Sequence, residues 1–242
     1  MSNNIKFVQC SSYDDLSKKT AINFIEIIKN KHNAILGLAT GSSPIGTYKE
    51  MIKSYEEKAI SFKECISFNL DEYIGLKKEY KNQSYQYFMN ENLFSKIDIN
   101  KKNTHFPVDA FNESVGNDFE SYDNKIDSYG GMDILILGIG NNGHIGFNEP
   151  GSKIDSKTRM IDLTESTIKA NSRFFDNEKD VPRKSVTMGL STILKARKIV
   201  LVVVGDSKKD ALNALRSSKS FDSNWPCTAL VNHNDVIVYY IN

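Results

Sequence analysis

Short aliphatic runs alternate along this chain with longer segments whose apolar residues recur every three or four positions. Such runs suit strands buried on both faces, and the longer segments suit helices that cover a sheet. This alternation predicts a three-layer α/β fold, with a mostly parallel sheet and helices on both faces. No repeat, linker or low-complexity tract interrupts residues 1–242, so a single domain is expected. The expected strands are 5–8, 34–39, 64–70, 104–108, 134–137, 159–163, 198–204 and 236–241, and the main expected helices are 13–29, 47–59, 85–97, 113–129, 164–175 and 190–196.

The aliphatic run 134–137 leads into a glycine-rich loop that ends at Gly151. Glycine lets the backbone adopt left-handed conformations and approach a ligand closely. The loop carries His144 and Glu149, which can form a hydrogen-bonded pair. Because ligands of open α/β sheets bind beyond the carboxyl ends of the strands, this loop is the leading candidate for an active site. The alternative is a purely structural glycine-rich loop that holds a satisfied histidine.

The same loop matches the G-x-G-x-x-G pattern of dinucleotide sites through Gly138, Gly140 and Gly143. That pattern requires a helix to begin at its third glycine. Here Gly146 and Pro150 follow within a few residues, and they do not propagate a helix. A nicotinamide or flavin site is therefore not expected.

A second turn, residues 40–46, joins an expected strand to an expected helix. Ser43 fits the N-cap position and Pro44 the first helical position. Backbone donors and the helix dipole make such a turn suitable for a small phosphate ester. The Gly-Lys-Ser/Thr ending of a nucleotide-hydrolysing loop is absent. A capped helix without a ligand is an equally good interpretation of these residues alone.

Two adjacent acids, Asp71 and Glu72, follow the expected strand 64–70. Acids at the carboxyl end of an apolar strand are hard to explain by packing. We expect one of them to point into a pocket and the other to cap a helix or face water.

The composition limits the partners. With 31 basic and 30 acidic side chains and no block of like charge, neither nucleic acid nor a membrane surface is expected to bind. Cys10, Cys65 and Cys227 lack metal-ligand spacing, so free thiols in a reducing compartment and no metal site are expected. The N-terminus shows no apolar signal region, and the longest aliphatic run, 199–204, is too short to span a bilayer, so a cytoplasmic location is expected.

In a parallel sheet the flagged features meet at one edge, beyond the strand carboxyl ends. A phosphate-binding turn, the cations Arg173 and Lys208, a lone carboxylate and a histidine oriented by another carboxylate then form one set. Such a set can hold a sugar phosphate, open its ring with the imidazole and move a proton next to a carbonyl with Asp71. An imidazole suits this work because histidine ordinarily titrates near neutral pH.

Four segments carry a family resemblance: 38–44, 68–75, 137–150 and 171–175. In this order they resemble the signatures of the glucosamine-6-phosphate deaminases, and the His-Ile-Gly-Phe-Asn-Glu-Pro stretch is highly specific. The resemblance implies a Rossmann-like fold, shared with 6-phosphogluconolactonases. It also implies an amino-sugar phosphate as partner, converted with water to fructose 6-phosphate and ammonia without an organic cofactor.

Residue by residue, the resemblance implies that Asp71 is the base that moves a proton between C2 and C1 of the sugar. It implies that His144 opens the ring and that Glu149 orients it. Asn142 stands where some members have aspartate and others asparagine; an amide can orient the ring but holds no negative charge. Tyr73 either lines the pocket or packs in the core. The implied substrate-binding set is Thr40, Gly41, Ser42, Ser43, Tyr73, Gly140, Arg173 and Lys208.

The resemblance to the allosteric hexameric members weakens after Lys208, and Ile161 stands where those members place a lysine. A monomer is therefore expected rather than a hexamer. Two other functions stay open. A sugar-phosphate lactonase would not need Asp71, and a sugar-phosphate sensor without catalysis would need neither Asp71 nor the His144–Glu149 pair.

Overall fold

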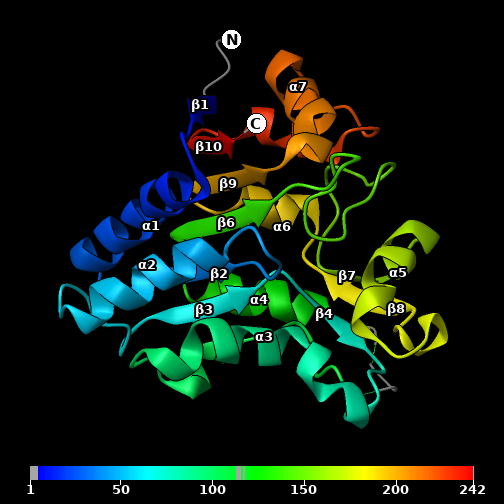
Figure 1. Cartoon of the computed structure of the whole chain (residues 1–242), viewed down its shortest axis with the longest axis horizontal. Coiled ribbons are helices and arrows are strands. Elements are labelled where there is room, and N and C mark those ends of the chain that lie inside the picture. The colour runs from blue at the N-terminus through cyan, green and yellow to red at the C-terminus, as the bar shows by residue number, and fades with distance from the viewer. Residues whose placement is uncertain (1–4, 113–115, 117, 242) are drawn as a thin grey trace.

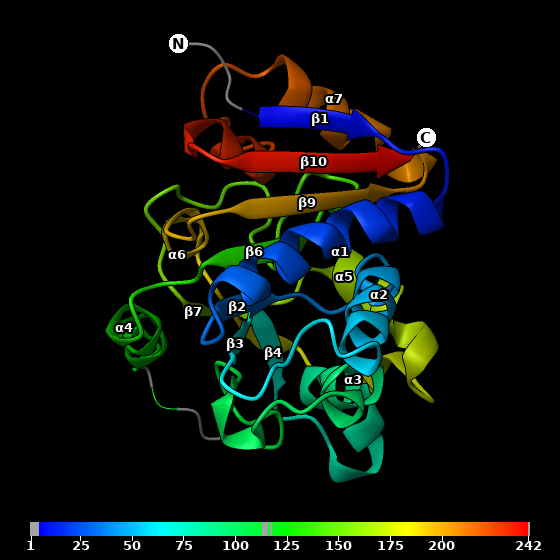
Figure 2. The same cartoon turned by 90° about the vertical axis from the view of Figure 1, so that its left-hand side faces the viewer.

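The computed structural model describes residues 5–112, 116 and 118–241. Its centre is a seven-stranded sheet in the order β1–β10–β9–β6–β2–β3–β5, and all of its described pairings are parallel (Figures 1 and 2). The strands of this sheet are β1 (Ile5–Gln9), β2 (Ile35–Leu38), β3 (Ile66–Asn69), β5 (Thr104–His105), β6 (Ile134–Gly138), β9 (Ile199–Val204) and β10 (Val236–Ile241).

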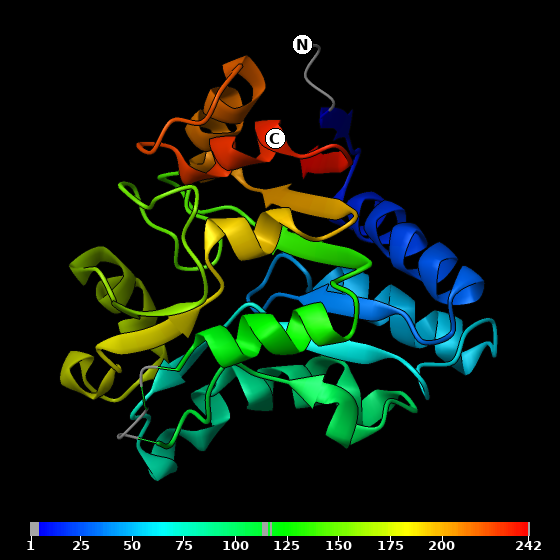
Figure 3. The same ribbon diagram turned by 180° about the vertical axis from the view of Figure 1, so that it is seen from behind.

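Helices cover both faces of the sheet, which confirms the predicted three-layer α/β fold. On one face α1 and α2 pack side by side, and α4 and α6 lie on the other face (Figures 1 and 3). The α-helices are α1 (Tyr13–Asn30), α2 (Ile45–Glu56), α3 (Tyr85–Asn92), α4 (Glu120–Ser128), α5 (Glu165–Asn171), α6 (Leu190–Leu194) and α7 (Lys209–Ser217). The 3-10 helices are η1 (Lys78–Gln83), η2 (Phe94–Lys96), η3 (Lys101–Asn103), η4 (Ser172–Phe174), η5 (Glu178–Asp180), η6 (Asp206–Lys208) and η7 (Pro226–Asn232). Of the expected helix 113–129, residues 113–115 and 117 lie outside the described part.

The aliphatic runs form the core of the main sheet. All four residues from Ile134 to Leu137 are fully buried, as is the first half of β9. Central strands of a parallel sheet have helices on both faces, so a continuous apolar run buries every side chain. This explains why these strands could be predicted from the local sequence alone.

A second, smaller sheet was not predicted. It contains β4 (Asp71–Ile74), β8 (Lys184–Thr187) and β7 (Arg159–Asp162), in that order, and its strands are antiparallel. The expected strand 159–163 thus exists but belongs to this sheet, and Asp71, expected at the end of strand 64–70, begins a separate strand. Leu70 alone separates β3 from β4. Asp71 therefore stands where the chain passes from one sheet to the other.

The main sheet reverses its strand order between β2 and β6. From β2 the chain continues outwards through β3 to β5, whereas from β6 it continues through β9 to β10. The crevice at the carboxyl ends of two such strands is the usual ligand site of open α/β sheets. The turn after β2 and the glycine-rich loop after β6 begin at these two strand ends. In Figure 1 the arrowheads of β3 and β6 point towards that edge.

Candidate active site

Asn142, His144 and Glu149 form a hydrogen-bonded network in the loop that follows β6. Asn142 Nδ2 donates to Glu149 Oε2 at 2.6 Å, and His144 Nδ1 lies 2.9 Å from Asn142 Oδ1. Because the amide nitrogen is engaged by the carboxylate, the amide oxygen faces the imidazole and accepts from it. Nδ1 therefore carries a hydrogen, and Nε2 is the nitrogen available to exchange a proton.

Glu149 is held in its ionised form. Partial burial raises the pKa of this carboxyl, but hydrogen bonds from His144, Asn142 and Thr167 outweigh burial and leave the pKa below its ordinary value. Its Oε1 lies 3.5 Å from His144 Nδ1. A negative charge at this distance stabilises the positive charge that the ring acquires when Nε2 takes up a proton.

The His144 imidazole packs directly against the backbone of Gly140. A Cβ atom at this position would lie 2.2 Å from His144 Cε1 and 2.4 Å from Nε2, closer than any side chain tolerates. Gly140 N also donates to the His144 carbonyl at 2.8 Å, which closes the loop around the ring. The missing side chain of Gly140 thus creates the space that the histidine occupies.

The fold brings Asp71 against the same loop. Asp71 pairs with Thr187 across the small sheet, and the Thr187 hydroxyl accepts from the backbone N–H of Phe147 at 3.1 Å. A Cβ atom at Gly146, whose φ is +56°, would lie 3.7 Å from Asp71 Oδ2. Gly146 is two residues from His144, so the Asp71 carboxyl lies against the loop that carries the histidine network.

Of the two adjacent acids, the structure identifies the one that caps a helix. Asp71 is only 8% exposed; burial first, and then the charge of Glu72, raise its pKa to about 8. Glu72 is fully buried and accepts from the backbone N–H groups of Tyr73, Tyr85 and Gln86. Burial raises the pKa of Glu72 to about 7 in spite of these hydrogen bonds. Glu72 is therefore the helix-capping acid, at the start of α3.

Tyr73 both packs against a neighbouring aromatic ring and forms a hydrogen bond. Its side chain is buried, and its ring centroid lies 4.8 Å from that of Tyr85. Its hydroxyl accepts from Asn171 Nδ2 at 2.8 Å. Tyr73 therefore links β4, beside Asp71, to the end of α5.

The turn after β2 contains Thr40, Gly41, Ser42 and Ser43. Gly41 has a φ of +101°, and Ser42 is exposed. The Tyr13 hydroxyl braces the turn, because it donates to the Ser42 carbonyl at 3.0 Å and accepts from Gly46 N at 2.8 Å.

The predicted capping of α2 is wrong by one position. Pro44, not Ser43, occupies the N-cap, and no side-chain cap hydrogen bond forms there. The helix begins at Ile45 because Tyr13, from α1, takes the N–H of Gly46 that a capping side chain would otherwise bind.

The two expected cations lie on separate segments at this edge. Lys208 ends η6, just beyond the carboxyl end of β9, and burial lowers its pKa. Within the described part of the chain, no hydrogen bond or ion pair joins its ammonium group to another residue. Arg173 follows α5, is exposed, and has its guanidinium 4.6 Å from the Phe174 ring centroid. The structure does not bring these two side chains into contact with each other or with Ser42.

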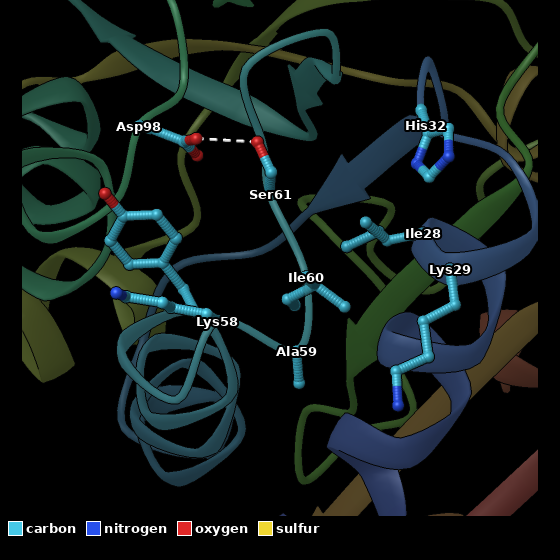
Figure 4. Close-up of a pocket in the computed structure, with 9 residues that line it drawn as sticks. Ile28, Lys29, His32, Lys58, Ala59, Ile60, Ser61 and Asp98 are labelled. Carbon is cyan, nitrogen blue, oxygen red and sulfur yellow. Dashed lines mark hydrogen bonds between the residues drawn. The ribbon is translucent and has the colours of Figure 1, made fainter.

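Two surface hollows differ in their relation to this site. One, of about 500 Å³, lies at the opposite edge of the sheet, beside the ends of α1 and α2 (Figure 4). Its carboxylate, Asp98, is already satisfied by Ser61 Oγ and Phe62 N. The other, of about 530 Å³, is bordered by Glu149, Ser152 and Arg159. Of these two hollows, the second adjoins the His144 network, through Glu149.

Three residues that brace the candidate site were missed by sequence reasoning: Thr167, which contacts Glu149; Tyr13, which contacts the turn after β2; and Thr187, which contacts Phe147. Thr167 follows the capping Thr164 by three positions, a spacing that places its hydroxyl beside the cap. No sequence signal connects Tyr13 or Thr187 to loops more than two dozen residues away.

Other sites are limited as follows. Among the residues with described positions, no group of three or more His, Cys, Asp or Glu side chains is arranged to hold a metal ion. No described helix is long and apolar enough to cross a membrane. Cys10, Cys65 and Cys227 are free thiols, and all three are buried.

Residues 11–239 match the family of glucosamine-6-phosphate isomerases and 6-phosphogluconolactonases. Glucosamine-6-phosphate deaminase from Malacoplasma penetrans is 79% identical over the whole of both chains. The deaminase from Mycoplasma mycoides is 50% identical over 97% of this chain and 93% of its own length. A solved structure described as a monomeric glucosamine-6-phosphate deaminase is 38% identical, with a TM-score of 0.90 over 98% of this chain and 97% of that one. A 6-phosphogluconolactonase from Trypanosoma brucei shares the fold, with a TM-score of 0.73 at 17% identity.

Proposed function

Because the chain belongs to the family of glucosamine-6-phosphate isomerases and 6-phosphogluconolactonases, we propose that it is a glucosamine-6-phosphate deaminase in which Asp71 and His144 share the chemistry. The observation that carries the proposal is the position of Asp71, whose carboxyl faces the loop that holds His144. A lactonase takes no proton from carbon and would have no use for this second acid–base group.

Ring opening falls to His144. Its Nε2 takes the proton of the C1 hydroxyl and returns a proton to the ring oxygen, so the C1–O5 bond breaks and an open-chain aldehyde forms. Asn142 fixes the tautomer that leaves Nε2 available, and Glu149 stabilises the transient imidazolium.

Proton transfer at carbon falls to Asp71. Its carboxylate takes the proton from C2 of the open chain and delivers it to C1, while a proton passes from the amino group to the C1 oxygen. The 2-amino aldehyde thereby becomes the imine of fructose 6-phosphate. Water then adds to C2 of the imine, the C2–N bond breaks, and ammonia leaves. A buried carboxyl with a raised pKa holds the proton long enough to pass it on, rather than losing it to solvent.

The phosphate group has a separate set of ligands at the same edge. We assign it to the hydroxyls and backbone N–H groups of the turn Thr40, Gly41, Ser42 and Ser43, together with Arg173 and Lys208. Lys208 is half-buried and burial lowers its pKa, a cost that a bound phosphate would offset. Tyr73 forms a wall beside Asp71, and Gly140 leaves room for the imidazole.

Ammonia release tests the function directly. The purified protein is expected to release ammonia from glucosamine 6-phosphate without an added cofactor, as followed with a glutamate dehydrogenase assay. Hydrolysis of 6-phosphogluconolactone without ammonia release would favour a lactonase. Tight binding of glucosamine 6-phosphate with no turnover of either compound would favour a sensor.

Glu72→Gln is expected to move the acid limb of the pH profile of kcat/KM towards lower pH. Asp71 works as a base only when ionised, so the wild-type profile should rise as the pH passes through about 8. Glutamine keeps a hydrogen-bond acceptor for the start of α3 but removes the charge that helps to raise the pKa of Asp71. The substrate amine titrates in the same way with both enzymes, so the difference between the two pH profiles reports on the protein alone.

Glu79→Gln is the matched control, because Glu79 is exposed on η1. Its profile should overlay that of the wild type. An unmoved limb in Glu72→Gln would mean that Asp71 does not set it.

We also propose that residues 1–242 act as one domain, as a monomer and in the cytoplasm. The deaminase structure described as monomeric supports the oligomeric state. Light scattering in solution should then give the chain mass of 27.3 kDa; a mass several times larger would contradict it.

A further inference from the structure

Helix α5 touches the active site at both of its ends. Near its start, the Thr167 hydroxyl donates to Glu149 Oε1 at 3.2 Å. At its end, Asn171 Nδ2 donates to the Tyr73 hydroxyl at 2.8 Å, beside Asp71. One short helix thus contacts the surroundings of both proposed acid–base groups.

The hydrogen-bond order around Thr167 gives its hydroxyl a direction. The Thr164 hydroxyl donates to Thr167 Oγ1 at 3.0 Å. Since that interaction uses Thr167 Oγ1 as an acceptor, the hydrogen of Thr167 is available for Glu149. Thr164 itself caps α5 by accepting from Thr167 N. The first turn of α5 therefore presents a hydroxyl donor to the Glu149 carboxylate.

The two oxygens of Glu149 have different partners. Oε2 accepts from Asn142, and Oε1 is the oxygen that lies 3.5 Å from His144 Nδ1. Thr167 is the hydroxyl donor to Oε1. Without it, the carboxylate can rotate about its bond to Cγ, and the charge beside the imidazole is no longer held in place.

We propose that Thr167 is a positioning residue for ring opening, which acts through Glu149 on His144. This inference rests on the proposed deaminase function.

Thr167→Val is the informative variant, because valine keeps the branched shape and removes the donor. Its kcat for ammonia release is expected to fall about 10-fold, the loss typical of one hydrogen bond to a charged group, with KM changed less than about 2-fold. Thr167→Ser restores the donor and should keep kcat within about 2-fold of the wild type. A merely structural threonine would lower the thermal midpoint without a specific fall in kcat.

Thr20→Val is the matched control. Thr20 is fully buried on α1, and its hydroxyl has no hydrogen-bond partner among the described residues. The same substitution there removes a hydroxyl without touching the site, so kcat and KM should both stay at wild-type values.

A double-mutant cycle with Glu149→Gln completes the test. If Thr167 acts through Glu149, Thr167→Val should cost less than about 2-fold in the Glu149→Gln background. Fully additive losses, or a Thr167→Val enzyme with wild-type kcat, would overturn the inference. These outcomes differ from failure of the proposed function, in which the wild-type protein itself releases no ammonia.

Discussion

Asp71→Asn is expected to lower the rate of ammonia release by about 10³-fold, within the range that general acid–base catalysis contributes. Asparagine has nearly the same shape but cannot accept the proton from C2. The phosphate ligands lie on other segments, so fructose 6-phosphate should bind with a dissociation constant close to that of the wild type. Calorimetric titration with fructose 6-phosphate separates the two effects.

The same substitution should stabilise the protein at alkaline pH. The pKa of Asp71 rises from 3.8 to about 8 on folding, so the native state binds more protons than the unfolded state between these values. Wild-type stability therefore falls as the pH rises from about 4 to about 8, on the order of a few kcal/mol. Asparagine does not ionise and escapes this loss. Urea unfolding should show a large gain for Asp71→Asn at pH 8 and almost none at pH 4.

Asp155→Asn is a suitable control for both measurements, because Asp155 is an exposed aspartate. It should leave turnover and stability unchanged. A substantial rate retained by Asp71→Asn would remove Asp71 from the mechanism. A loss of stability at pH 8 would contradict its burial as a neutral acid.

Gly140→Ala is expected to reduce kcat by roughly 100-fold, since small misplacements of a catalytic group cost this much. The new methyl group would lie 2.2 Å from His144 Cε1, so the imidazole must leave its position between Asn142 and the glycine. Gly140 needs no left-handed conformation, so the loss would come from the displaced ring and not from backbone strain. A crystal structure of the variant should show a different His144 rotamer.

Gly138→Ala is the matched control in the same segment. Nothing lies within 4 Å of a Cβ atom placed at Gly138, so activity should stay close to that of the wild type. Equal losses in the two variants would point to a general effect on the loop. Wild-type activity in Gly140→Ala would show that the imidazole has a second productive position.

The main sheet could be predicted because its strands are continuous aliphatic runs, as in β6 and β9. Their burial on both faces leaves a signal in composition that needs no knowledge of neighbours. The small sheet left no such signal. The sequence of β4 is Asp-Glu-Tyr-Ile, and its partners in β8 are more than a hundred residues away. Its strand character comes from tertiary pairing, which local patterns do not encode.

For the candidate site, too, features with a local sequence signal could be predicted and features set by tertiary contacts could not. The loop of His144 and Glu149 was predictable, because glycines and ionisable groups after a buried strand indicate a ligand site. The close approach of the ring to Gly140 and the donation from Thr167 were not, since both depend on where separate segments meet. Capping of a helix by one of the two adjacent acids was expected. Only the position of α3 identifies Glu72 as the capping acid.

The small sheet has its own apolar clusters, apart from the large core beneath the main sheet. Its strand β4 begins with Asp71, so the proposed base lies in the sheet with the smaller apolar clusters. Opening of β7 and β8 costs less free energy than global unfolding, because fewer buried contacts are lost. Heating, or a destabilising substitution in those strands, is therefore expected to abolish activity while the circular dichroism spectrum is still that of the folded protein. Inactivation should occur at a lower temperature than global unfolding.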